Sequence, residues 1–171
     1  MLQYVYAFHL EEDDGETFFS FPSIPEIVSS IPNERFECMS VGEIYEHARD
    51  AVIVALQACI ACRDALPASD DPRVVSADGF VRLLPLEAMK LVLYTVYFAN
   101  CSSISDFARQ IRKQDTAARR LLNLRHQSKT SEIEEALVVF NKRFVHSWGT
   151  EPASETLTQR IQTLTAAAAM A

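Results

Sequence analysis

Apolar and polar positions in the first half of the chain alternate in a way that predicts β-strands. Residues 3–10 are rich in β-branched and aromatic side chains, which favour a strand. A polar turn with a glycine over 11–16 separates it from a second strand over 17–21, so the two form a predicted hairpin. Further strands are predicted over 27–31 and 80–84.

A long helix is predicted after Ser40. Ser40 and Glu43 have the spacing of a capping box, in which each residue satisfies a backbone N–H of the other. Apolar side chains then recur at helical spacing as far as Leu66, and Pro67 ends the pattern. We expect this helix to cover the apolar face of the hairpin.

The second half of the chain has the periodicity of helices. Apolar residues repeat at helical spacing over 86–99 and 131–142. Between them, 103–125 predicts two short helices joined by a tight polar connection, with Ser103 as N-cap and Asp106 three residues later. The fold class is therefore α+β: a small N-terminal hairpin and sheet domain packed by one long helix, then an all-α domain with helix-turn-helix spacing.

These elements predict three parts of the chain. Residues 1–84 form an α/β domain, and 85–149 form the helix-turn-helix domain, in which 144–148 is a short strand. Residues 150–171 are a tail that is partly helical or disordered.

Charge is divided unequally between the two halves. The 171 residues carry a net charge of −7. Residues 1–79 contain fifteen acidic and four basic side chains, whereas 80–171 contain eight acidic and twelve basic ones. Residues 103–129 alone hold seven Arg or Lys and two Asp, a net charge of +5. This asymmetry suggests an acidic module for a basic partner and a basic module for phosphate.

The basic stretch is predicted to bind DNA. In a helix-turn-helix the second helix enters the major groove with its N-terminal residues at base edges. The candidate contacts are Lys113, Gln114, Thr116, Arg119, Arg120, Asn123, Arg125 and Lys129. Gln114, Thr116 and Arg119 are the candidates for bases, because glutamine pairs with adenine and arginine with guanine. The later residues suit phosphates. The alternative is a solvated basic face on a helical bundle.

No residues in the sequence predict catalysis, a cofactor or a metal site. Cys59 and Cys62 have redox-motif spacing, but they lie within an apolar helical run and are interpreted as small buried residues. The acidic residues of the hairpin turn come from one loop, whereas a metal nuclease needs carboxylates from several strands. Asp106 and Asp115 are interpreted as helix caps.

The sequence also favours a cytoplasmic protein. Acidic residues at 11–14 interrupt the region where a secretory signal would place its apolar core. The most apolar run, 51–62, is too short to span a bilayer, and the four cysteines do not form a disulfide-dense pattern.

Two parts of the chain resemble one family. Residues 19–26, together with 40–51, resemble the N-terminal domain of HicB-type antitoxins. Residues 120–129 resemble the end of the recognition helix and the next loop in HicB proteins that carry a Cro/repressor-type helix-turn-helix. The resemblance covers roughly 2–144. Arg112 differs from the pattern, because such motifs often have glycine there.

The resemblance implies a two-part antitoxin that is not an enzyme. The N-terminal domain would neutralise a small basic HicA-like toxin that cleaves RNA. The C-terminal domain would repress its own operon through operator DNA, as a homodimer or in a larger hetero-oligomer with toxin. The candidate toxin contacts are Glu12, Asp13, Asp14, Phe19 and Phe21. The alternative is a protein-interaction module, or a solitary transcriptional regulator, whose toxin-binding or DNA-binding role has been lost.

Overall fold

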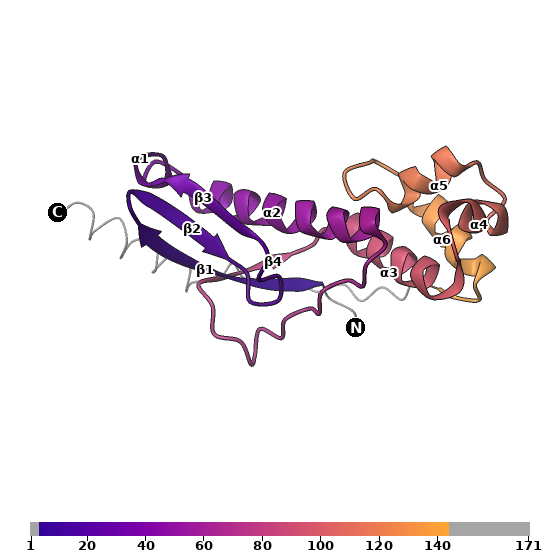
Figure 1. Ribbon diagram of the computed structural model, residues 1–171, viewed down its shortest axis with the longest axis horizontal. Coiled ribbons are helices and arrows are strands. Elements are labelled where there is room, and N and C mark those ends of the chain that lie inside the picture. Colours follow the sequence, from indigo (N-terminus) through magenta and orange to yellow (C-terminus); the bar gives the residue numbers. More distant parts are fainter. Residues whose placement is uncertain (1–3, 144–171) are drawn as a thin grey trace. The chain divides into compact units, whose positions relative to one another are not determined.

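The computed structural model describes residues 4–143, and Figure 1 shows their elements. In chain order these are β1 (Val5–Asp13), β2 (Glu16–Ser20), β3 (Val28–Pro32), α1 (Asn33–Phe36), α2 (Val41–Cys62), β4 (Gly79–Arg82), α3 (Pro85–Asn100), α4 (Ile104–Gln110), α5 (Asp115–Leu122) and α6 (Thr130–Val139). The described residues form a four-stranded antiparallel sheet and six helices, which confirms the α+β class. The predicted strand at 144–148 and the predicted tail lie outside them.

The sheet has the strand order β3-β2-β1-β4. Its central hairpin turns over two residues, since Asp13 pairs with Glu16 and only Asp14 and Gly15 lie between them. Both turn residues have positive φ angles, 45° and 79°. This is the backbone of a type I′ turn, whose twist matches that of the strands, and Asp-Gly is among its preferred sequences.

Two acidic residues after α2 accept hydrogen bonds from the backbone of the sheet. Asp70 Oδ2 accepts a hydrogen bond from the Ala7 N–H at 2.8 Å. Asp78 Oδ2 accepts one from the Leu10 N–H at 2.8 Å. These carboxylates satisfy backbone donors of β1, so part of the N-terminal acidic charge has a structural role.

The start of α2 follows the predicted capping box. Glu43 Oε2 accepts a hydrogen bond from the Ser40 N–H at 2.8 Å, and the Glu43 N–H donates to Ser40 Oγ at 3.4 Å. The Ser40 hydroxyl also donates to Glu43 Oε2 at 2.7 Å, and this bond, followed by the one from the Ser40 N–H, lowers the pKa of Glu43. The box therefore sets where α2 begins.

Aromatic side chains form the core between the sheet and α2. Phe8 lies with its ring centroid 5.9 Å from Phe19, 6.4 Å from Phe21 and 5.9 Å from Tyr45 of α2. Phe8 is 0% exposed. Because this cluster joins β1, β2 and α2, the helix covers the hairpin as predicted.

Gly79, at the start of β4, has no room for a side chain. A Cβ atom there would lie 2.4 Å from Cζ of Phe8, whose ring is held by the aromatic cluster. We expect Gly79→Ala to lower the free energy of unfolding by about 2 kcal/mol, as overpacking usually does. Gly42→Ala is the matched control, because the nearest atom to its Cβ is 4.0 Å away and alanine favours the helix. Urea denaturation measures both; equal effects would contradict this prediction.

The chain divides into two compact units, which we call the sheet unit and the helical unit. Among the described residues, the sheet unit comprises 4–55 and 67–82, and the helical unit comprises 56–66 and 83–143. The helical unit is built on a core shared by α3, α4, α5 and α6. The last turns of α2 belong to the helical unit.

Candidate functional site

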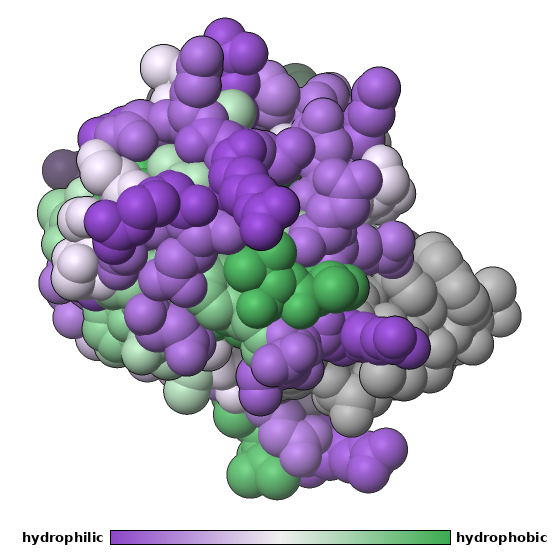
Figure 2. Space-filling view, turned by 90° about the vertical axis from the view of Figure 1, so that its right-hand side faces the viewer, coloured by the Kyte–Doolittle hydropathy of each residue, from purple (hydrophilic) through white to green (hydrophobic). Residues whose placement is uncertain are grey.

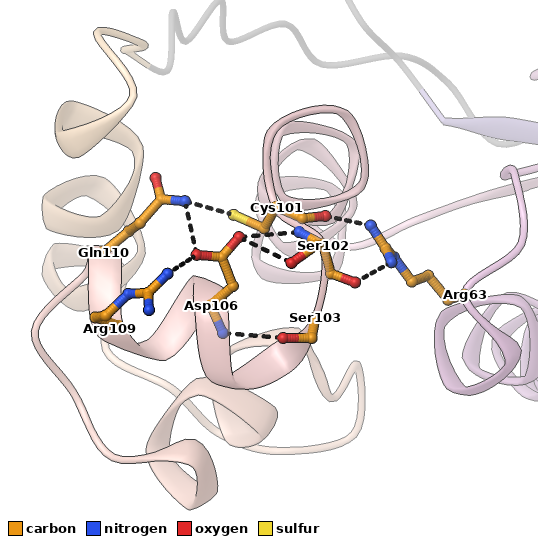
Figure 3. A network of polar contacts seen from close by, with 7 residues as sticks. All are labelled: Arg63, Cys101, Ser102, Ser103, Asp106, Arg109 and Gln110. Atoms are coloured by element: carbon orange, nitrogen blue, oxygen red, sulfur yellow. Dashed lines mark hydrogen bonds and ion pairs between the residues drawn. The ribbon is translucent and has the colours of Figure 1, made fainter.

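The first of the two short helices, α4, begins at the predicted N-cap. The Asp106 N–H donates to Ser103 Oγ at 3.1 Å, and Asp106 Oδ2 accepts a hydrogen bond from the Ser102 N–H at 2.9 Å (Figure 3). That bond from Ser102, followed by those from Gln110 and Arg109, lowers the pKa of Asp106. The aspartate therefore remains ionised at the helix N-terminus, where the macrodipole favours an anion.

An arginine that the sequence did not single out caps the end of α3. The guanidinium of Arg63 donates to the backbone carbonyls of Cys101 and Ser102, as Figure 3 shows. It also lies 5.6 Å from the centre of the Tyr97 ring. Carbonyls at a helix C-terminus lack partners within the helix, so Arg63 satisfies groups that would otherwise be left unpaired.

The connection between α4 and α5 contains an arginine in a left-handed conformation. Arg112 has φ 55°. Its N–H donates to the Arg109 carbonyl at 3.2 Å, and the Lys113 N–H donates to the Ala108 carbonyl at 2.9 Å. These two bonds define a Schellman motif, which glycine usually completes. The backbone here thus takes the turn that glycine favours, with an arginine in its place.

The second short helix, α5, is strongly amphipathic. Ala118, Leu121 and Leu122 are buried in the core. Ser105 Oγ of α4 donates to Asp115 Oδ2 at 2.5 Å and so ties the start of α5 to α4. Both helices are therefore held through their polar ends as well as through the core.

Most of the predicted DNA contacts are exposed side chains. Exposed side chains are those of Gln114, Thr116, Arg119, Arg120, Asn123, Arg125 and Lys129, while Lys113 is half-buried. Positions three and four residues apart share a helix face, so Thr116, Arg119 and Arg120 are neighbours on the outward side of α5. We call these three residues the α5 stripe.

The loop after α5 is held by one hydrogen bond from a distant residue and one within the loop itself. The Leu124 N–H donates to Oε1 of Gln57 in α2 at 2.9 Å. Asn123 Oδ1 accepts a hydrogen bond from the Arg125 N–H at 2.9 Å, so this candidate phosphate contact also shapes its own loop. Gln57 and Arg63 were missed from the sequence because their partners lie far along the chain.

The structure corrects two of the candidate toxin contacts. Glu12, Asp13 and Asp14 are exposed at the hairpin turn. Phe19 and Phe21 are only 0% and 2% exposed, because both belong to the aromatic core. Their side chains offer no surface to a partner, and the candidate contact surface reduces to the acidic turn.

The cysteines also differ from the interpretation as buried residues. Cys62 is exposed and Cys59 is half-buried. Cys101 is buried, and burial raises the pKa of its thiol. Within residues 4–143, no group of three or more His, Cys, Asp or Glu is arranged to hold a metal ion. None of the helices in that range is both long enough and apolar enough to cross a membrane.

The site and the fold define an α+β protein with a basic surface on its helical unit. The chain is 26% identical over 150 residues to Antitoxin HicB of Pseudomonas fluorescens (strain Pf0-1), covering 85% of this chain and 94% of that protein. No family model matches the chain. The similarity includes both units, and it supports the resemblance to HicB-type antitoxins.

Proposed function

We propose that this chain is a cytoplasmic HicB-like antitoxin that neutralises a small RNA-cleaving toxin and represses its own operon. The similarity to Antitoxin HicB over most of both chains supports the antitoxin role. The division into an acidic sheet unit and a helical unit with a basic surface supports two separate binding tasks.

In this proposal α4 and α5 form a helix-turn-helix, with α5 as the recognition helix. The observation that carries it is the α5 stripe, where Thr116, Arg119 and Arg120 project from a short helix whose other face is buried. The Schellman turn at Arg112 supports the same arrangement, since it ends α4 and leaves a short connection to α5. Gln114 and Arg119 would meet base edges, while Arg120 and the following loop would meet phosphates.

The test of DNA binding is an electrophoretic titration with duplex DNA from upstream of the chain's own reading frame. We expect the logarithm of the DNA affinity to fall linearly with the logarithm of the salt concentration, because each neutralised phosphate releases counterions. Absence of binding at low salt would refute the repressor role and favour a pure interaction protein.

The partner of the sheet unit would be a small basic HicA-like toxin. Glu12, Asp13 and Asp14 surround an exposed turn and could meet its basic surface. Co-expression with the neighbouring small reading frame tests this role: the chain should restore growth that the neighbour arrests. RNA cleavage by the purified chain alone would instead indicate an enzyme.

A repressor that reads two half-sites needs two copies of the chain, and we infer that α6 pairs them. On the face that Figure 2 displays, exposed apolar side chains gather in small areas bordered by polar ones. Val138 and Val139 are 55% and 49% exposed and, among the described residues, are the only large exposed apolar side chains adjacent in sequence. Exposed Glu135 precedes them, and exposed Lys142 follows. We propose a two-fold axis between the valines; Lys142 lies beyond the end of α6 at Val139, and this pairing sets it against Glu135 of the other copy.

This pairing predicts a charge-swap result. Glu135→Lys or Lys142→Glu alone should weaken dimerisation about tenfold, because each places like charges together, and the double variant should restore it. Analytical ultracentrifugation without DNA measures the effect. Val138→Ala, which shortens a side chain of the proposed contact without changing its charge, should weaken dimerisation less than either charge change. Dimers that persist unchanged in both single variants would contradict the α6 interface.

A further inference from the structure

Lys90 of α3 is a lysine with no access to water. Its side chain is 0% exposed, and its helix neighbours Met89 and Leu91 are also buried. Burying an ammonium group among apolar side chains is costly unless hydrogen bonds satisfy it. A methionine or leucine would fill the same space without that cost, so the lysine calls for a reason beyond packing.

The partners of Lys90 lie just beyond the end of α5. Its Nζ donates to the backbone carbonyl of Asn123 at 2.5 Å and to that of His126. Asn123 is the C-cap of α5. Carbonyls at a helix C-terminus lack internal partners and carry the negative end of the macrodipole, which attracts an ammonium group. Lys90 therefore caps α5 from a different helix.

The charge on Lys90 is sensitive to pH in an unusual range. Burial lowers the pKa of Lys90 to about 8 from an ordinary value of 10.5, and the nearby charge of Glu87 opposes this shift. Glu87 lies one turn earlier on α3, where its Oε2 also accepts a hydrogen bond from the Leu84 N–H at 2.8 Å. On the loop side, the His126 ring faces Ser128 Oγ at 3.2 Å. The ammonium form thus dominates at neutral pH.

The loop that Lys90 holds carries two exposed basic residues. Arg125 and Lys129 lie between the end of α5 and the start of α6, in a segment without a helix or strand of its own. Its conformation therefore depends on tethers, of which Lys90 supplies two hydrogen bonds and Gln57 supplies one.

We propose that Lys90 is a positioning residue for phosphate binding: by holding the carbonyls of Asn123 and His126, it fixes the loop that presents Arg125 and Lys129 to the DNA backbone. This inference rests on the proposed DNA-binding function. Lys90 itself does not touch DNA, because it is fully buried.

The test uses the full chain and a short duplex of arbitrary sequence, since phosphate contacts do not depend on sequence. Lys90→Met should reduce the slope of log affinity against log salt by about 1.8, the value for two phosphates, as Arg125→Ala/Lys129→Ala should. Adding Lys90→Met to that double variant should cause no further loss, because Lys90 acts through those residues. Arg73→Met, which removes an exposed charge in the sheet unit, is the control and should leave the slope unchanged.

The wild-type chain provides a second readout through pH. Because the folded pKa of about 8 lies below the ordinary 10.5, the unfolded chain binds more protons between these values, and this group makes stability rise with pH there. DNA affinity should fall over the same interval, as the neutral amine holds the carbonyls less strongly. If Lys90 served only the stability of the fold, DNA affinity would instead rise with pH together with the free energy of unfolding. Arg125→Ala/Lys129→Ala should lose this pH dependence.

Two results would overturn the inference, and a third would remove the function on which it rests. An additive further loss in the triple variant would show that Lys90 acts elsewhere. If Lys90→Met does not fold, wild-type affinity that stays constant as pH passes through 8 would overturn it. If the wild-type chain binds no duplex at all, the proposed DNA-binding function is refuted. That result differs from DNA binding that does not depend on Lys90, which would refute only the role of Lys90.

Discussion

Replacing Arg119 and Arg120 together with alanine is expected to weaken operator binding by about a hundredfold or more, because each base or phosphate contact contributes about 1–3 kcal/mol. Both side chains are exposed on the α5 stripe. Their loss should therefore leave the free energy of unfolding within about 0.5 kcal/mol of the wild-type value. Electrophoretic titration and urea denaturation measure the two quantities on the same preparations.

Arg35→Ala/Arg73→Ala is the matched control for that experiment. It removes two exposed arginines from the sheet unit and changes the net charge by the same amount. If this control weakened binding equally, the effect would come from overall charge and not from α5. Toxin neutralisation should survive in the Arg119/Arg120 variant, since the candidate toxin surface lies in the other unit.

Arg63→Met is expected to lower the free energy of unfolding of the helical unit by about 2–3 kcal/mol. The substitution leaves the carbonyls of Cys101 and Ser102 without their charged donor and removes the guanidinium from the Tyr97 ring. The midpoint of urea denaturation, followed by helical circular dichroism, measures this loss.

Arg109→Met is the control for Arg63→Met, because Arg109 belongs to the same network of polar contacts (Figure 3). Arg109 pairs with Asp106 at 2.6 Å, but its side chain is 80% exposed. Such a surface ion pair contributes about 0–1 kcal/mol, because water screens it and side-chain entropy opposes it. Equal destabilisation by the two variants would mean that Arg63 does not act as a helix cap.

The elements of this fold were predictable wherever their signals are local. Alternation predicted the strands, and the Ser40–Glu43 box marked the start of α2. The Ser103 cap of α4 was found in the same way, because its hydrogen bond spans only three residues. The short helix α1 carries no such signal, and its stretch was not predicted to be helical.

Side-chain environments were predicted less well. Phe19 was expected at a partner surface, yet β2 packs it into the aromatic core. Cys62 was expected in the core, yet it lies exposed at the end of α2. Periodicity indicates that a residue lies on one face of an element, but the neighbouring elements decide whether that face is covered.

The α+β class, the order of most elements and the position of the basic stretch could be predicted, because they depend on propensity, spacing and charge within short segments. The residues that hold the basic stretch in place could be identified only from the folded chain. Gln57 bonds to a group 67 residues away along the chain. Arg63 bonds to groups 38 and 39 residues away, and Lys90 to groups 33 and 36 residues away. Such contacts arise from packing between helices, so no local pattern records them.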